Sequence, residues 1–453
     1  MNPLASLLRQ LENPALSPDG RAETRCQAAR ELEEAGDYEA AREALGGLWP
    51  RFGEPPGVEG LESSTAAEVL LRAGTLTGWI GSCNQIKHAQ EEAKDLISRS
   101  IRVSESTNYP KKILEAQTEL AYCYWRTGEY DEARIILEGV LERLRADGEL
   151  KAKAVLRLAI VEWGAARHKL SFRILTDHAA LFEKVNSHTV KGGYHNQLAV
   201  AFRTLAASEG RRDYLDRAFI EYEAASYHFE EAGHKRYLAN VENNLGFLFY
   251  EVGKYKEAHE HLARARRLTV LLKDKAHAAR VDETRARVML AERRAAEAER
   301  VVRACVRSLE DGGQQWLLAE SLITHGRALA RVGRMREARA AFVRAVEAAR
   351  ASGAASRAGE AALAMLEELG TQLTAGGASR CREASGTFDE EVRRYEAELI
   401  RDTLRRAHGS VSRAAHLLGV SHQRLCGILK TRHRELEAER TPPLSRRPRA
   451  TKA

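Results

Sequence analysis

Proline is almost missing from the middle of this 453-residue sequence. Seven of its ten prolines lie at or before Pro110 and the other three at or after Pro442, so residues 111–441 contain none. Proline disrupts the interior of a helix, whereas the Ala, Leu, Glu and Arg that dominate this region are strong helix formers. Aromatic residues make up only 6% of the chain. The sequence therefore predicts an all-α protein.

Other absences exclude several classes of protein. No run of about 18 apolar residues occurs, which argues against a membrane-spanning helix. The first twenty residues show no basic segment ahead of an apolar one, so we expect no secretory signal. The six cysteines form no Cys-x-x-Cys pair, which argues against a disulfide framework or a zinc site. These features together are typical of a protein of the reducing cytoplasm.

The motifs of several enzyme classes are missing too. Neither a phosphate-binding G-x-x-x-x-G-K-[ST] loop nor a G-x-S-x-G sequence occurs. His259 and Glu260 begin an H-E-x-x-H pattern, but position 263 is alanine. His261 falls on another helix face, so we expect no metal site there. The sequence predicts a protein that is not an enzyme and that has no cofactor.

An internal repeat runs through most of the chain. In its clearest unit, NNLGFLFYEVGKYKEAHEHLARA, Gly253 ends one helix and Tyr255, Ala258 and Leu262 share a face of the next. Small residues such as Gly246 and Ala258 allow two antiparallel helices to approach closely. The pattern predicts stacked helical hairpins. Six alanines stand in equivalent positions, the last four of them 40 residues apart: Ala41, Ala133, Ala218, Ala258, Ala298 and Ala338.

This order of glycine, aromatic residue and alanine resembles the tetratricopeptide repeat. The resemblance covers about residues 20 to 370, with weaker units near Ala89 and Arg173 and with Arg293 in place of one turn glycine. The period is longer than the common 34 residues and the closing proline is missing, as in the longer-helix variant of several bacterial regulators. The resemblance implies a superhelix of about eight helical hairpins.

Such a superhelix presents the first helix of each hairpin along a concave groove. Asparagine can bond the backbone of an extended peptide, and arginine can bind a carboxylate. We therefore expect the groove to bind a protein, a peptide or a small ligand, with a merely solvated polar face as the alternative. The 40-residue register places in the groove Arg203, Asn240, Asn243, Phe247, Arg280, Glu283, Arg287, Glu320 and Arg327.

Positive charge is concentrated near the end of the chain. Residues 388–453 contain 15 Lys and Arg against 9 Asp and Glu, a net charge of +6, whereas the whole chain carries +7. No acidic residue lies between Thr403 and Arg434. A basic segment on an otherwise nearly neutral protein is typical of an end that binds nucleic acid.

Three amphipathic segments occupy this basic end, after small polar residues that predict a linker. The first runs from Asp389 to Arg406 and ends at Gly409. The second, VSRAAHLLG, is capped by Ser410 or Ser412, and the third, HQRLCGILKTRH, by Ser421. The short joint of Gly419, Val420 and Ser421 makes the last two a helix-turn-helix. In its first helix we expect mostly buried side chains at Ala414, Ala415, Leu417 and Leu418.

The string YEAELIRDTLRRAHGSVSRAAHLLGVSHQRL resembles the Fis-type DNA-binding domain, which is also found at the C-terminus of nitrogen-regulator-type bacterial activators. The resemblance implies a third helix in the major groove, where Arg424 can bind guanine through two hydrogen bonds. It also implies a dimer, paired through the helix from Asp389 to Arg406. His422 and Ser410 stand where the family usually has arginine and often has asparagine. The implied base contacts are His422, Gln423, Arg424 and Gly427, and the implied phosphate contacts are Ser410, Ser412, Lys430 and Arg432.

We therefore predict a bacterial transcriptional regulator, cytoplasmic and associated with the nucleoid when it binds duplex DNA. Its parts would be a sensing array at 1–370, a linker at 371–387, a helix-turn-helix domain at 388–436 and a basic disordered tail at 437–453. The alternative is a scaffold whose array assembles partner proteins and whose terminal bundle only dimerises. The basic end favours DNA, because a scaffold would not need that charge.

Overall fold

The computed structural model describes residues 7, 9–11, 13, 15–310, 312, 314–352, 355–375 and 388–439. These residues form α- and 3-10 helices and no strand, which confirms the predicted all-α class. None of the described helices is long and apolar enough to cross a membrane. The chain divides into two units, Met1–Glu368 and Leu369–Ala453.

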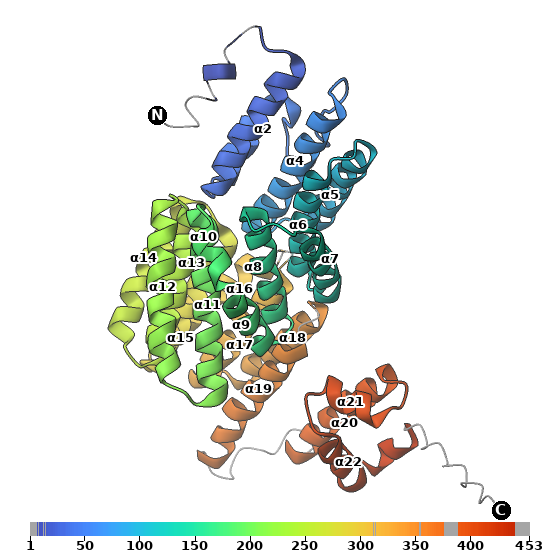
Figure 1. Cartoon of the computed structure of the whole chain (residues 1–453). Helices are drawn as coiled ribbons and strands as arrows, with labels where there is room; N and C mark the ends of the chain where they lie inside the picture. Colours follow the sequence, from blue (N-terminus) through green and yellow to red (C-terminus); the bar gives the residue numbers. More distant parts are fainter. Residues whose placement is uncertain are drawn as a thin grey trace, which may run out of the picture. The chain divides into compact units, whose positions relative to one another are not determined.

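The first unit is a superhelical stack of antiparallel helical hairpins, each packed on the next (Figure 1). Its described residues form eight of them, which confirms the predicted number. Three further helices are η1 (Gly46–Leu48), α10 (Ala179–Lys184) and α19 (Ala355–Ala375), which ends the stack. The hairpins are α2 (Pro18–Glu34) with α3 (Tyr38–Leu45), α4 (Ser63–Asn84) with α5 (Ala89–Ser106), α6 (Pro110–Thr127) with α7 (Tyr130–Arg143), α8 (Glu149–Gly164) with α9 (His168–Asp177), α11 (His188–Glu209) with α12 (Asp213–Glu231), α13 (Lys235–Glu251) with α14 (Tyr255–Leu271), α15 (Lys275–Ala291) with α16 (Ala295–Glu310), and α17 (Gln315–Arg331) with α18 (Met335–Ala351).

The repeated alanines lie at close contacts between neighbouring helices, and all six are fully buried. Gly246 has the same role, because a Cβ there would lie 2.6 Å from Cγ of Leu262. The two weaker units are also hairpins, with Ala93 of α5 and Ser171 of α9 fully buried. Arg173, near which the second of these was predicted, is itself exposed.

The repeat that lacks a turn glycine keeps the geometry of the others. Gly253 and Gly333 follow α13 and α17 with φ angles of 77° and 82°, and Arg293 follows α15 with a φ of 64°. This left-handed conformation costs a residue with a side chain about 1–2 kcal/mol. Stacking of α15 on α16, with Ala298 fully buried between the helices, offsets that strain.

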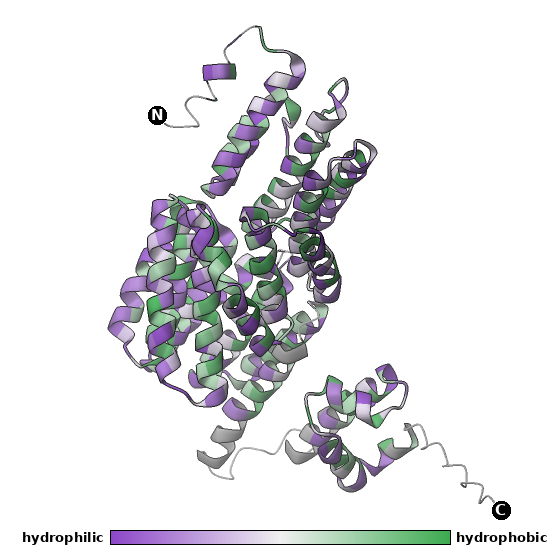
Figure 2. Ribbon diagram, viewed as in Figure 1, coloured by the Kyte–Doolittle hydropathy of each residue, from purple (hydrophilic) through white to green (hydrophobic). Residues whose placement is uncertain are grey.

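Hydrophobic residues lie mostly on the helix faces that meet within the stack, and hydrophilic residues lie mostly on the outer faces (Figure 2). Among the described residues, the largest cluster of buried apolar side chains spans α15 to α19. In that cluster Phe342 of α18 is fully buried. A Cβ on Gly326 would lie 2.7 Å from the ring of Phe342, so glycine allows α17 to rest directly on this ring.

A buried cluster of charges joins the first three hairpins. Arg72 of α4 is only 3% exposed, and its guanidinium contacts Glu33 at 2.8 Å, Glu68 at 3.2 Å and Glu115 at 2.8 Å. Arg30 of α2 and Lys112 of α6 bind the same Glu68 and Glu115. Burial by itself would raise the pKa of Glu115, but the positive charges of Arg72, Arg30 and Lys112 lower it to about 2. Each buried charge therefore has an opposite charge in contact.

A second buried titratable group is His234, which precedes α13 and is 1% exposed. Its Nδ1 accepts a hydrogen bond from the backbone N–H of Tyr237 at 3.2 Å, and so caps the helix. Burial lowers the pKa of His234 to about 3. The folded protein therefore holds this imidazole neutral, whereas the unfolded chain protonates it below about pH 6.5.

Acid is expected to destabilise the array through this histidine. As the pH falls from 6.5 towards 3, the unfolded state binds a proton that folded His234 does not, so stability is lost. At pH 5 that difference amounts to about 2 kcal/mol. Urea unfolding at pH 7 and pH 5 should show a loss smaller by that amount in a His234→Asn variant, which keeps a capping acceptor. Equal losses in both proteins would mean that His234 does not carry the effect.

The second unit includes the helices α20 (Phe388–Arg406), α21 (Val411–Leu417), α22 (His422–Thr431) and η2 (Arg434–Glu439). Two predicted segments are partly helical: α19 covers residues 371–375 of the predicted linker, and η2 covers residues 437–439 of the predicted tail. The rest of the predicted linker, 376–387, and of the predicted tail, 440–453, lies outside the described residues.

Candidate nucleic-acid interface

A small apolar core holds the helices of the second unit together. Leu425 and Leu429 bury one face of α22, while Ala415 of α21 is small enough for the two helices to cross closely. Leu417 was predicted to be mostly buried. That prediction is wrong, because the residue is 49% exposed. The core comprises Ala397, Ile400, Leu404, Ala407, Val411, Ala414, Ala415, Leu425, Leu429 and Leu436.

The joint between α21 and α22 has the chemistry that the sequence indicates. Gly419 takes a φ of 66°, a left-handed conformation that favours glycine. Ser421 then caps α22 by accepting a hydrogen bond from the N–H of Arg424 at 3.2 Å. Ser410 caps α21 in the same way, with the N–H of Arg413 at 3.4 Å. This predicted phosphate contact therefore has a structural role as well.

The start of α22 presents polar side chains to solvent. Gln423 and Arg424 are exposed, and no carboxylate is in ion-pair contact with Arg424 in the described part of the chain. Gly427, one turn later, is exposed with no atom near its missing side chain. Because Leu425 and Leu429 are buried on the opposite face, the core aims these three positions outwards together.

His422 is engaged by its own protein. Its Nδ1 lies 3.3 Å from Oγ of Ser412 on α21, and its Nε2 lies 3.5 Å from Sγ of Cys426 one turn later. Both ring nitrogens therefore have partners, and the contact links α21 to α22. Two predicted contacts, Ser412 and His422, are thus brought together. No sequence pattern predicts this contact, because the orientation of an exposed ring depends on the folded structure.

The far end of α22 is tied to α20. Lys430 and Arg432 are exposed, as phosphate contacts require. The Nη1 of Arg432 lies 3.7 Å from Glu396. His433 is 1% exposed and contacts Glu396 at 3.1 Å and Glu435 at 3.2 Å. This buried histidine was not among the predicted residues, and it joins the segment after α22 to Glu396 of α20.

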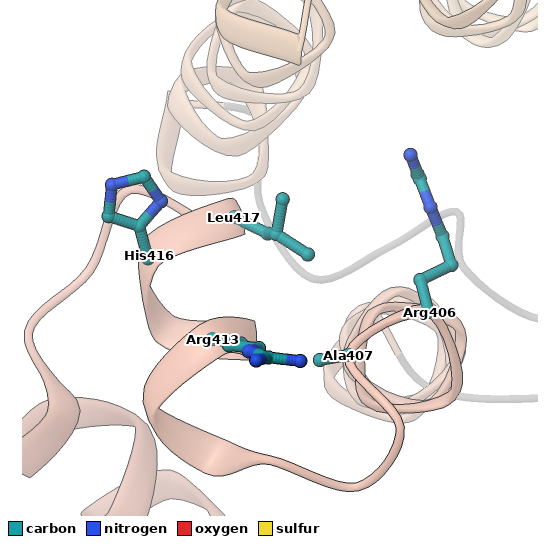
Figure 3. Close-up of a pocket in the computed structure, with 5 residues that line it drawn as sticks. All are labelled: Arg406, Ala407, Arg413, His416 and Leu417. Carbon is teal, nitrogen blue, oxygen red and sulfur yellow. The ribbon is translucent and has the colours of Figure 1, made fainter.

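A pocket beside α21 was not predicted either (Figure 3). Exposed Leu417 lies at one wall, beside Arg406, Ala407, Arg413 and His416. His416, which also lines the pocket, lies one helical turn after Ser412 on α21. The lining of the pocket contains no carboxylate.

In the first unit, the 40-residue register brings part of the predicted groove row together. The guanidiniums of Arg203 on α11 and Arg287 on α15 lie 4.6 Å and 5.4 Å from the ring centre of Phe247 on α13. Arg280 donates to Oδ1 of Asn240 at 3.0 Å. These five residues come from three successive hairpins and form cation–π and hydrogen-bonded contacts between them.

Other members of the row have different surroundings. Asn243 is 3% exposed, and its Oδ1 has no hydrogen-bond partner. Glu283 is buried and binds Thr324 and Arg287. Arg327 of α17 is 3.7 Å from Glu367 of α19, and Glu320 also lies on α17. Separately, His259 pairs with Glu292 and His261 with Glu242, so the two histidines of the H-E-x-x pattern have different partners.

The fold and this interface define a class of protein in which the first unit is a helical-repeat array and the second unit contains a helix-turn-helix domain. Residues 391–425 match the family model described as bacterial regulatory protein, Fis family. Residues 114–143, which span α6 and α7, match the tetratricopeptide repeat model. Both resemblances seen in the sequence are thus confirmed. No curated protein matches the sequence.

Solved structures of bacterial regulators resemble the fold. The apo form of the quorum sensor NprR from B. thuringiensis is 9% identical, with 76% of this chain and 92% of that one covered and a TM-score of 0.50. The Rap conjugation gene regulator of the plasmid pLS20, in complex with the Phr* peptide, is 12% identical, with 77% and 94% covered and a TM-score of 0.49. At such identities the likeness concerns the fold alone.

Proposed function

We propose that this protein is a transcriptional regulator that binds duplex DNA through α22 and senses a ligand through its repeat array. The observation that carries the proposal is the outward face of α22, where Gln423, Arg424 and Gly427 are exposed on a helix fixed by its buried opposite face. The match of residues 391–425 to the Fis family supports the same function. A helix-turn-helix reads DNA with side chains in these positions.

Each part of the interface has a separate task in this proposal. Arg424 binds the O6 and N7 of a guanine, and Gln423 pairs with a neighbouring base edge. Gly427 leaves room for the DNA beside α22. Lys430 and Arg432, with the exposed serine Ser412, hold phosphates and so fix the register of the helix on the duplex. His422, held by Ser412 and Cys426, supports the surface rather than reading a base.

We infer that the protein binds DNA as a dimer. Two copies of α22 would address half-sites one helical turn, about 34 Å, apart. In the array, the arginines around Phe247 and the buried amide of Asn243 would bind an extended peptide or another small ligand with carboxylate and amide groups. The protein would act by binding alone, without catalysis, from the cytoplasm.

Selection of DNA from a pool tests the proposal. Full-length protein would be mixed with fragmented genomic duplex at about 150 mM salt, and the retained fragments would be sequenced. We expect a small set of fragments to be enriched, and their retention to fall steeply with added salt because phosphate contacts release counterions. If no fragment is retained above competitor DNA, the second unit is a packing module and the array's protein partners become the function to pursue.

A further inference from the structure

The repeat array touches itself across almost 200 residues of sequence. The turn between α2 and α3 lies against the start of α13, where a Cβ on Gly36 would be 2.4 Å from Cε1 of His234. In Figure 1, α2 ends beside the group of helices that contains α13. Nearby, the hydroxyl of Thr189 on α11 donates to the carbonyl of Glu34 at 3.1 Å. The first hairpin therefore meets the fifth and the sixth.

One side chain makes most of this contact. Arg236 of α13 is 4% exposed. It donates to the carbonyl of Gly36 at 2.8 Å and to the carboxylate of Glu39 at 2.6 Å. A further nitrogen lies 3.3 Å from the sulfur of Cys83, at the end of α4. A single guanidinium thus joins three positions in the first two hairpins to the sixth.

The next two hairpins repeat the relationship. Gln314, just before α17, donates to the carbonyl of Ser82 at 3.0 Å. A Cβ on Gly128, in the turn between α6 and α7, would lie 2.7 Å from the carbonyl oxygen of Ser352. Each contact joins one of the first three hairpins to a residue between 153 and 232 positions later. Together they form a seam between the first and second turns of the superhelix.

The seam is largely polar. Its contacts are hydrogen bonds to backbone carbonyls, to one carboxylate and to the sulfur of Cys83, the close approach of Gly36 to His234, and the rings of Trp79 and Tyr237, whose centres are 6.1 Å apart. Neighbouring hairpins, in contrast, share clusters of buried apolar side chains. Polar contacts exchange for water at little net cost, whereas buried apolar surface does not. We therefore expect the seam to separate more readily than the boundaries between neighbouring hairpins.

The seam is also connected to the helices of the predicted groove. Arg236 donates at 2.8 Å to Asp274, which caps α15 by accepting from the N–H of His277 at 3.0 Å. Asn240 and Asn243 follow Arg236 on α13, and Arg280 and Arg287 follow Asp274 on α15. A shift of α13 against α15 would therefore alter the geometry of the Arg236–Asp274 pair.

We propose that the seam opens as a unit, with Arg236 as the latch that holds the two superhelical turns together. In the open state the first three hairpins separate from the fifth to the eighth hairpins while each hairpin stays folded. Opening uncovers Cys83, which is 3% exposed in the closed state. The link from this latch to ligand sensing rests on the proposed function, but the opening itself does not.

Alkylation of Cys83 in the full-length protein tests the opening. N-ethylmaleimide would be added under native conditions without any ligand, and labelled peptides would be quantified by mass spectrometry. Cys305, buried in the core between α15 and α18, is the internal reference because only wider unfolding exposes it. We expect Cys83 to react at least about tenfold faster than Cys305 in the wild-type protein.

Variants then identify the latch. Arg236→Met should accelerate labelling of Cys83 about tenfold or more, and Glu39→Gln, a milder change at a half-exposed carboxylate, about threefold, both without accelerating Cys305. Arg211→Met, which removes an exposed ion pair with Asp213 at the start of α12, away from the seam, should change neither rate. If Cys83 and Cys305 react at equal rates in the wild type, or if both latch variants leave Cys83 unchanged, the proposal is wrong. Selective DNA binding is measured in a separate experiment. A failure of the proposed function can therefore be distinguished from a failure of the seam to open.

Discussion

An Arg424→Ala variant is expected to lose sequence selectivity on duplex DNA while it keeps weak general binding. Arg424 is exposed at the start of α22 and has no carboxylate contact among the described residues, so its guanidinium is available to a base. Two hydrogen bonds to guanine discriminate against the wrong base by about 1–3 kcal/mol. The ratio of binding to a selected fragment over a scrambled one should therefore fall roughly 5- to 150-fold.

Lys430→Ala provides the matched control on the same helix. Lys430 is exposed near the far end of α22, where we propose a phosphate contact. Its loss should weaken binding to selected and scrambled duplex by a similar factor and reduce the salt dependence. Titrations of both variants at several salt concentrations separate the two roles. A uniform loss of affinity with Arg424→Ala would mean that Arg424 contacts the DNA phosphates, and that other residues contact the bases.

Replacing Phe342 with alanine is expected to cost the array about 3–5 kcal/mol of unfolding free energy. The ring is fully buried in the cluster between α15 and α19. Gly326 of α17 lies directly against the ring. For α17 to move into the empty space, the other residues of α17 in this cluster would have to lose their own packing contacts. The variant therefore loses both the transfer free energy of the ring and the contacts around the cavity. Urea unfolding monitored by circular dichroism would measure the change.

The adjacent Val343 supplies the control, since it lies on the same helix and is 42% exposed. Val343→Ala should alter stability by no more than about 0.5 kcal/mol. If both variants lose the same amount, the loss does not come from the buried ring, and helix propensity would not explain it either, because alanine is the better helix former at both positions.

Contacts between neighbouring hairpins could be predicted from the sequence because they repeat. An alanine every 40 residues fixes the place where two helices approach, and Arg203, Phe247 and Arg287 meet because one helix position recurs in three successive hairpins. The helix-turn-helix was equally predictable. Its glycine, its capping serines and its buried leucines are local requirements of the backbone, readable over some twenty residues.

Contacts between superhelical turns could not be predicted in this way. Gly36 meets His234 only after the small rotation between successive hairpins has accumulated over five of them, and no local pattern encodes that rotation. Leu417 was misjudged for a related reason. Its position in the seven-residue helix α21 fits a buried face. The residues of α21 that face the core are instead Val411, Ala414 and Ala415. Which residues of α21 do so depends on the angle at which α21 crosses α20.

The charged cluster around Arg72 has a consequence for how the chain assembles. Similar hairpins along one polypeptide can stack in the wrong order or exchange with those of another copy. Arg72 finds three carboxylates only when α2, α4 and α6 lie side by side, because Glu33, Glu68 and Glu115 come from these three helices. Any other neighbour would leave a buried charge without its partner, at a cost of several kcal/mol. We therefore expect this cluster to stabilise one stacking order of the first three hairpins and to destabilise every other order.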